Sequence, residues 1–164
     1  EGHAQATLVE EQDDGYVDSP SPATASTQKA FHRRHEEAAE AFSLLEQGVR
    51  CYKRRRFPEA LEALQMASIL APEEARVWRY LSAAYFELGE YEQAIAASRR
   101  VVRLNPDDPV ALCNLGTVLR KAGAPGQARA YQLRARRLAP GYRRARVELA
   151  KLDRLERDAQ SDDS

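Results

Sequence analysis

The stretch ARVWRYLSAAYFELGEYEQAIAASRRVVRLNPDD, residues 75–108, contains two amphipathic segments separated by a turn signal. Apolar residues recur at intervals of three and four in 75–88, and 91–104 repeats this pattern, so each segment is expected to form a helix with one apolar face. The letters LGEY between them stop one helix and start another, and NPDD ends the second helix and offers acidic caps to the next. The stretch therefore predicts a helical hairpin.

The same arrangement recurs on both sides of this stretch with a step of 34 residues. Three columns carry the repeat: a proline (Pro72, Pro106 and Pro140), an alanine (Ala60, Ala94 and Ala128) and a small residue (Gly48, Ser82 and Gly116). Alignment on these columns gives three units, 41–74, 75–108 and 109–142. A hairpin alone leaves an apolar face in water, so the units are expected to stack.

The three units resemble tetratricopeptide repeats over about 100 of the 164 residues. The second unit matches the family pattern best, with Trp78, Leu81, Ser82, Tyr85, Ala94 and Pro106 in the expected columns. The resemblance implies an all-α fold, a right-handed α–α superhelix of three helical hairpins plus a capping helix over 143–158. Two departures stand out: Gln47 replaces a leucine, and Arg55 occupies the turn position where the later units have Gly89 and Gly123. Arginine at a turn that needs a positive φ costs roughly 1 kcal/mol relative to glycine.

The ends of the chain differ from its middle. Residues 1–40 carry nine acidic and three basic residues, whereas 41–151 carry eleven acidic and twenty basic ones. Residues 1–26 are acidic and aperiodic and are predicted to be a disordered tail, with 27–158 as the repeat domain and 159–164 as a second disordered tail. The first helix is expected to begin near residue 28. Because the sequence starts with Glu1 rather than Met, a signal or a further domain upstream stays open.

Composition argues against several classes of protein. A mean hydropathy of −0.62 and the lack of a long apolar run argue against a membrane span. Cys51 and Cys113 form no metal-binding or redox motif and suggest reduced thiols in a cytoplasmic protein. Known catalytic and phosphate-binding motifs are missing, so we expect no enzyme, no cofactor and no metal site, and read His32 and His35 as solvent-facing. The arginine pairs fall on several faces, which argues against nucleic-acid binding.

In tetratricopeptide repeats the first helix of each hairpin lines a concave groove, and the resemblance assigns positions of this sequence to it. The groove positions are Phe42, Leu45, Glu46, Val49, Tyr52 and Lys53, then Arg76, Arg79, Tyr80, Ala83, Phe86 and Glu87, then Val110, Cys113, Asn114, Thr117, Arg120 and Lys121, and finally Arg144. They sum to a charge of about +4. From them we select as candidate peptide-binding residues Tyr52, Lys53, Arg76, Arg79, Tyr80, Phe86, Asn114, Thr117, Arg120, Lys121 and Arg144.

A basic groove with aromatic residues favours an extended or helical peptide that has acidic residues around an apolar anchor. The sequence therefore predicts a protein–protein interaction module, an adaptor or assembly scaffold. The alternative is a chaperone of the type III secretion kind (class II), which shares the layout of three repeats between two helices. Some tetratricopeptide repeats hold the C-terminus of a chaperone in a clamp of lysine, asparagine and arginine side chains, but such binding is not expected here. When the clamp is aligned from the first unit, Leu45 and Val49 stand where it needs lysine and asparagine. When it is aligned from the second unit, Ala83 and Glu148 do not match it. Self-association, or docking of the acidic tail in the groove, is a further hypothesis.

Overall fold

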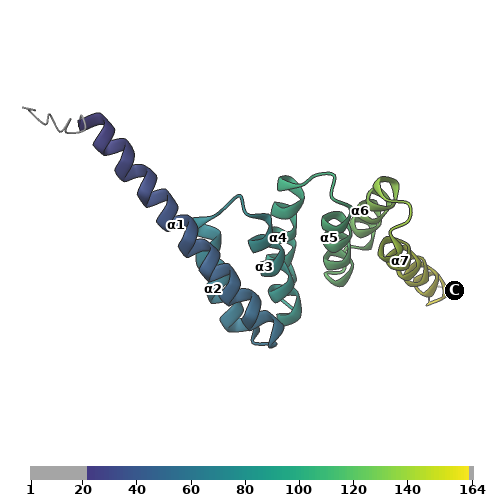
Figure 1. Cartoon of the computed structure of the whole chain (residues 1–164). Coiled ribbons are helices and arrows are strands. Elements are labelled where there is room, and N and C mark those ends of the chain that lie inside the picture. The colour runs from purple at the N-terminus through teal and green to yellow at the C-terminus, as the bar shows by residue number, and fades with distance from the viewer. Residues whose placement is uncertain (1–21, 163–164) are drawn as a thin grey trace, which may run out of the picture. The chain divides into compact units, whose positions relative to one another are not determined.

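A computed structural model describes residues 22–162, which form seven helices and no strand (Figure 1). The helices are α1 (Pro22–Lys53), α2 (Phe57–Leu70), α3 (Ala75–Leu88), α4 (Tyr91–Leu104), α5 (Pro109–Lys121), α6 (Pro125–Leu138) and α7 (Arg143–Asp162). The predicted all-α helical-repeat fold is confirmed. The chain divides into two units, 1–34 and 35–164, with the boundary inside α1. In the described part of the first unit, the rings of Phe31 and His32 meet edge to face.

Two boundaries differ from the sequence-based expectation. Helix α1 begins at Pro22 rather than near residue 28, so residues 22–26 are helical, and α7 continues past residue 158 to Asp162. Both extensions lack an interior proline or glycine, so the chain holds nothing that would stop the helix earlier. The rest of the predicted tails, 1–21 and 163–164, lies outside the described residues.

The second unit is built from hairpins whose turns repeat one hydrogen-bonding pattern. The amides of Arg56, Glu90 and Ala124 donate to the carbonyls of Cys51, Tyr85 and Leu119, five residues back, at 2.9 Å in each case. This bond closes a Schellman turn, which requires the residue before the donor to be left-handed. Gly89 and Gly123 meet that need with φ of 79° and 81°, and Arg55 adopts φ 61°. The predicted strain at Arg55 is therefore present.

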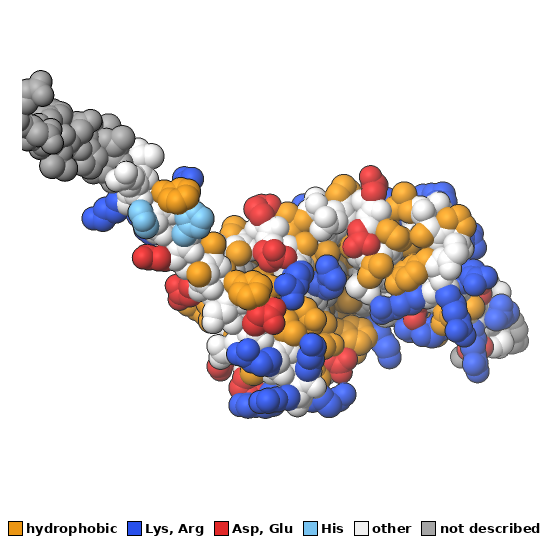
Figure 2. All heavy atoms as spheres, in the orientation of Figure 1, with side chains coloured by type: hydrophobic (Ala, Val, Ile, Leu, Met, Phe, Trp, Pro, Cys, Tyr) orange, Lys and Arg blue, Asp and Glu red, His pale blue; other side chains and the backbone are white. Residues whose placement is uncertain are grey.

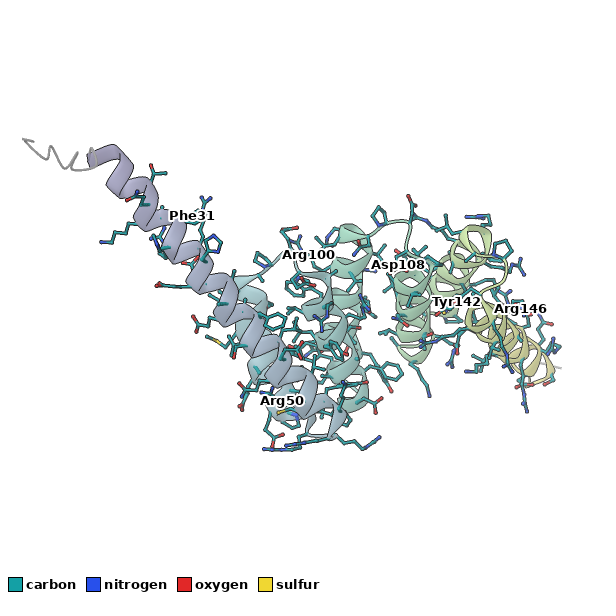
Figure 3. The ribbon with its side chains drawn as sticks, in the orientation of Figure 1. Phe31, Arg50, Arg100, Asp108, Tyr142 and Arg146 are labelled. Carbon is teal, nitrogen blue, oxygen red and sulfur yellow. The ribbon has the colours of Figure 1, made fainter. Side chains whose placement is uncertain are left out.

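The connections between hairpins are also alike. Helices α2, α4 and α6 end two residues before Pro72, Pro106 and Pro140, as their sequence predicts. Side chains Glu74 and Asp108 then accept from the amides of Arg76 and Val110, at 3.0 and 2.8 Å, which confirms the acidic caps. Arg100 and Arg134, 34 residues apart, donate to the carbonyls of Pro72 and Pro106. Figure 3 labels Arg100 on α4 and Asp108 at the start of α5.

Close approach of the two helices in each hairpin explains the column of small residues. A Cβ added to Gly48 would lie 2.5 Å from Leu64 Cγ, and one added to Gly116 would lie 2.6 Å from Gln132 Nε2. In the middle hairpin Ser82 takes the place of the glycine. The residue facing it is Ser98, which is smaller than the equivalent Leu64 and Gln132, and the two serine hydroxyls lie 2.5 Å apart. A larger residue on the first helix of a hairpin is thus matched by a smaller facing residue on the second helix.

Candidate functional site

Helices α1, α3, α5 and α7 line a cavity of about 340 Å³ in the second unit. The lining residues are Tyr52, Arg79, Tyr80, Ser82, Ala83, Phe86, Glu87, Asn114, Thr117, Val118 and Arg144. Seven of the eleven candidate residues are among them: Tyr52, Arg79, Tyr80, Phe86, Asn114, Thr117 and Arg144. The structure therefore brings most of the predicted positions, from four helices, to one hollow.

Aromatic rings form one side of this cavity. The rings of Tyr52 and Tyr80 meet edge to face with centroids 5.6 Å apart, and Tyr52 also packs against Phe57 of α2 at the same distance. Phe86 is held in a similar way by Tyr91, at 5.8 Å. Burial, followed by the nearby Glu87 carboxylate, raises the pKa of Tyr52, so its phenol stays protonated and can donate a hydrogen bond.

The charges at the cavity are fewer than the sequence suggested. Arg79 and Arg144 face one acid, Glu87, among the lining residues. Arg76 is bound to Glu46 at 3.1 Å, so its charge is already compensated. Within residues 22–162, Arg79 has no carboxylate partner. Lys53 and Lys121 are exposed and do not line the cavity, so the expected +4 of the groove is not concentrated there.

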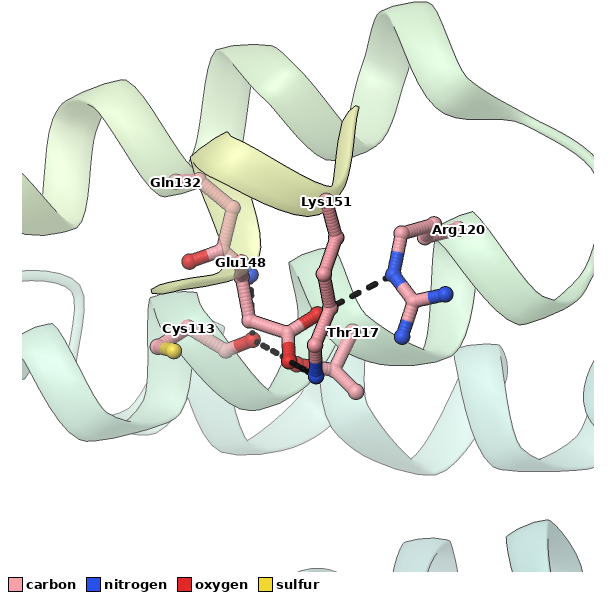
Figure 4. A network of polar contacts seen from close by, with 6 residues as sticks. All are labelled: Cys113, Thr117, Arg120, Gln132, Glu148 and Lys151. Atoms are coloured by element: carbon pink, nitrogen blue, oxygen red, sulfur yellow. Dashed lines mark hydrogen bonds and ion pairs between the residues drawn. The ribbon is translucent and has the colours of Figure 1, made fainter. Parts of the chain in front are cut away.

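Arg120 departs most from its predicted place. Its guanidinium donates to Glu148 of α7 at 3.0 Å, and Lys151 donates to the other oxygen of that carboxylate at 2.6 Å (Figure 4). The side chains of Glu148 and Arg120 are 6% and 14% exposed, so this is a buried ion pair that joins α5 to α7. Burial opposes ionisation of Glu148, but the hydrogen bonds from Lys151 and Arg120 outweigh it and hold its pKa below the ordinary value. Arg120 therefore joins α5 to α7 and is not among the residues that line the cavity.

Three of the assigned groove positions prove to be wrong. Leu45, Val49 and Cys113 are 2%, 4% and 0% exposed. Leu45 and Val49 pack in a core with Leu61 and Leu64 of α2, and Cys113 packs with Leu112 and Ala135. Phe42 is 60% exposed and Val110 38%, but neither lines the cavity. Position within a repeat gives the general face of a helix, whereas the size of the facing side chains decides whether that face is covered.

The cavity also contains residues that the sequence analysis did not select. Ser82 and Val118, both buried, lie on its floor, and the Ser82 hydroxyl donates to the Ala94 carbonyl at 3.0 Å. These positions face the interior of their hairpins, so no surface pattern distinguishes them. The sequence does offer one indication that Glu148 pairs with a base: it is the only acidic residue in 141–151, a segment with four basic residues. Among the described residues, no helix has the length and apolar character needed to cross a membrane.

Comparison with known proteins agrees with this architecture. A model of the TPR repeat matches residues 83–123. Human protein O-mannosyl-transferase TMTC1 is 34% identical over 115 residues, which are 66% of this chain but 13% of that protein. The chain thus spans about an eighth of the length of this relative and 12% of its mouse counterpart.

Solved structures extend the match in three dimensions. The Arabidopsis OM64 TPR domain aligns with a TM-score of 0.68 at 21% identity, covering 72% of this chain and 98% of that domain. The first TPR of Spaghetti (RPAP3), bound to the HSP90 peptide SRMEEVD, aligns with the same score at 22% identity, covering 71% and 93%. At these identities the likeness shows the fold. Together with the repeat model that matches residues 83–123, it identifies the fold as a solenoid of tetratricopeptide repeats.

Proposed function

We propose that the repeat unit binds a segment of a partner protein in the cavity between α1, α3, α5 and α7. The observation that carries this proposal is Arg79, a cation without a carboxylate partner in the described chain, set beside the partly exposed rings of Tyr80 and Phe86. An unpaired guanidinium next to aromatic surface is the combination found at the energetic centres of protein interfaces. Tetratricopeptide domains generally mediate protein–protein interaction, and the RPAP3 domain was solved with a peptide.

The arrangement of the lining residues suggests the chemistry of the ligand. Arg79, Asn114 and Arg144 lie in the first half of their helices, while Phe86 and Glu87 lie at the end of α3. Arg79 and Phe86 are seven residues apart, which corresponds to about 10.5 Å along a helix. We therefore expect an acidic group of the peptide near Arg79 and Arg144 and an apolar side chain near Phe86. Glu87 disfavours a second acid at that end.

The selected groove does not reproduce a chaperone-tail clamp in the first hairpin, because Leu45 and Val49 are buried in the core. Glu148, which does not match the clamp when it is aligned from the second unit, forms ion pairs with Arg120 and Lys151.

A standing protein complex remains the preferred partner class, with a scaffold or adaptor role and a cytoplasmic setting. The transferase activity named for the human relative is not carried over, since the match spans 13% of that protein. Docking of the acidic tail rests on residues outside the described part and stays a hypothesis.

The test begins with purification of the chain from its host and identification of what copurifies; a secreted translocator would instead indicate the secretion-chaperone alternative. Binding of the recovered partner is then measured by calorimetry with Arg79→Glu combined with Arg144→Glu. We expect a loss of about 100-fold, or about 2.7 kcal/mol, because an attractive contact becomes repulsive. Arg136→Glu combined with Arg137→Glu makes the same change of charge at exposed positions of α6 and should have little effect. Equal losses in both variants would place the binding site elsewhere.

A further inference from the structure

The second helices of the three hairpins differ in their solvent-facing stripes. The stripe of α2 is Glu62, Gln65, Met66 and Ile69; the equivalent residues are Ala96, Arg99, Arg100 and Arg103 in α4, and Ala130, Leu133, Arg134 and Arg137 in α6. Met66 and Ile69 thus stand where both later repeats have arginine. Their side chains are 52% and 70% exposed. Large apolar side chains at positions that are otherwise charged indicate a surface that a partner covers.

The stripe of α2 meets, at Gln65, a groove of about 510 Å³; Met66 and Ile69 are neighbours of Gln65 on the helix and do not line the groove themselves. Gln65 and Ser68 of α2 form one wall, residues of α4 from Gln93 to Arg103 form the other, and Trp78, Leu81 and Tyr85 of α3 form the floor. The groove shares no lining residue with the cavity between α1, α3, α5 and α7. It is therefore a separate surface, with its own basic residues Arg100 and Arg103.

The groove exists because α4 has a small residue where α6 has a large one. Ala97 lines the groove, and Tyr131 is its equivalent 34 residues later. Tyr131 packs against both C-terminal core clusters, one containing Leu112 and the other Leu115 and Leu119. The residue of α5 equivalent to Trp78 is Leu112, which is fully buried, whereas Trp78 is only partly buried. The first pair of hairpins therefore keeps open a space that the second pair fills.

The aromatic floor is held in place by its polar atoms. The Trp78 indole donates to the Pro72 carbonyl at 2.8 Å, and the Gln65 amide donates to the Tyr85 hydroxyl at 2.8 Å. Arg100 is engaged by Glu73 at 2.6 Å and lies over the Trp78 ring. With these polar groups satisfied, Trp78 and Tyr85 are already fixed in position, so little ordering is required on binding. Arg103, by contrast, has no carboxylate partner within residues 22–162.

We propose that the groove between α2 and α4 is a second protein-docking site, which takes a short partner segment with one large apolar side chain followed by an acidic residue. The apolar side chain would lie on Trp78, Leu81 and Tyr85, bordered by Ile69 and Met66. The acidic residue would lie at Arg103, the uncompensated charge of the groove. No acidic side chain lines the groove in the described part of the chain, so an acidic segment meets attraction there and a basic one repulsion. A protein with two such sites can hold two partners at once.

The experiment selects a phage-displayed random dodecapeptide library on the full chain carrying Arg79→Glu and Arg144→Glu. These changes disable the cavity between α1, α3, α5 and α7, so the outcome does not depend on the function proposed for it. We expect enriched peptides with Phe, Leu or Trp next to Asp or Glu. A synthetic copy should then bind at least tenfold more weakly, by fluorescence anisotropy, after Met66→Arg with Ile69→Arg, a pair that copies the residues of α4 and α6. The matched control is Val147→Arg with Leu155→Arg, two residues of α7 with 42% and 47% exposure, which should leave binding unchanged.

Ala97→Tyr, which copies Tyr131, should also abolish binding by filling the groove. If circular dichroism shows that this variant is unfolded, the Met66 and Ile69 pair alone decides. Absence of enriched peptides, or equal binding to the Met66→Arg and Ile69→Arg protein, would overturn the proposal. Binding of phosphatidylglycerol vesicles by the unaltered protein, with no peptide enriched, would also overturn it and identify a membrane-facing surface.

Discussion

Replacement of Glu148 by glutamine tests how α7 is fixed to the repeats. The change removes the charge that Arg120 and Lys151 share, while it keeps the size of the side chain. Breaking a buried ion pair by removing one partner costs about 3–5 kcal/mol, because the remaining charge stays desolvated. Lys151 is 51% exposed and can turn to water, but Arg120 is 14% exposed and cannot. We therefore expect the lower end of the range, about 3 kcal/mol.

Urea denaturation followed by circular dichroism measures this loss. For a domain of this size m is about 1–3 kcal/mol/M, so the midpoint should fall by about 1–3 M. The effect should depend on pH in a fixed direction. The pKa of Glu148 is held below its ordinary value, so its contribution is present above the unfolded carboxyl pKa of about 4.3 and is lost as pH falls through the lower folded value. The difference between wild type and variant should be largest near neutral pH and shrink below about pH 4.

A double variant, Arg120→Met with Glu148→Leu, provides the control. Replacing both partners by apolar residues of similar volume is often neutral or stabilising, so this protein should be close to wild type in stability. A loss below about 1 kcal/mol for Glu148→Gln, or a loss that is the same at pH 7 and pH 3, would refute the argument. The ion pair would then be too well hydrated to act as a buried one.

Three further substitutions test the turns and the packing inside the hairpins. Arg55→Gly should raise the free energy of unfolding by up to about 1 kcal/mol, because glycine adopts φ 61° without the strain of a side chain. Arg55 also lies over the Phe57 ring and 4.0 Å from Glu87, and a destabilised variant would show that these contacts matter more than the strain. Gly48→Ala should cost about 1–3 kcal/mol by overpacking against Leu64, whereas Gly126→Ala, with nothing within 4 Å of the new Cβ, should be neutral or stabilising. Thermal unfolding measures all three, and equal effects at the two glycines would contradict the packing argument.

Much of the fold follows from features that act within one hairpin. The 34-residue step of Pro72, Pro106 and Pro140 predicts where second helices end, because proline cannot continue a helix. Gly89 and Gly123 predict the turns through their freedom to adopt positive φ, and the same argument foresees the strained Arg55. These properties depend on a residue and its near neighbours in the chain, which is why a single sequence reveals them.

The candidate site is less predictable because its charges are set by partners far away in the sequence. Arg120 and Glu148 are 28 residues apart, and Arg76 and Glu46 are 30 apart. Neither pairing follows from the repeat pattern, since both join successive units through residues that are not repeated. The count of charges already set Glu46 against Arg76, but it left out Glu148, the partner of Arg120, and it included Lys53 and Lys121, which do not line the cavity.

The polar outer face of α1 limits how the array can associate. Val77, Leu81 and Ala84 of α3 are buried against the preceding hairpin, whereas the equivalent residues of α1 are the exposed Ser43, Gln47 and Arg50. Stacking another hairpin on that face would bury polar groups without partners, which costs free energy. End-to-end self-association by the same face is disfavoured for this reason. Among the described residues, apolar side chains are accessible on the sides of the array, including Tyr80 and Phe86 in the cavity and Met66 and Ile69 on α2. A partner that gains affinity from burial of apolar surface is therefore expected to contact the sides of the array rather than this face of α1.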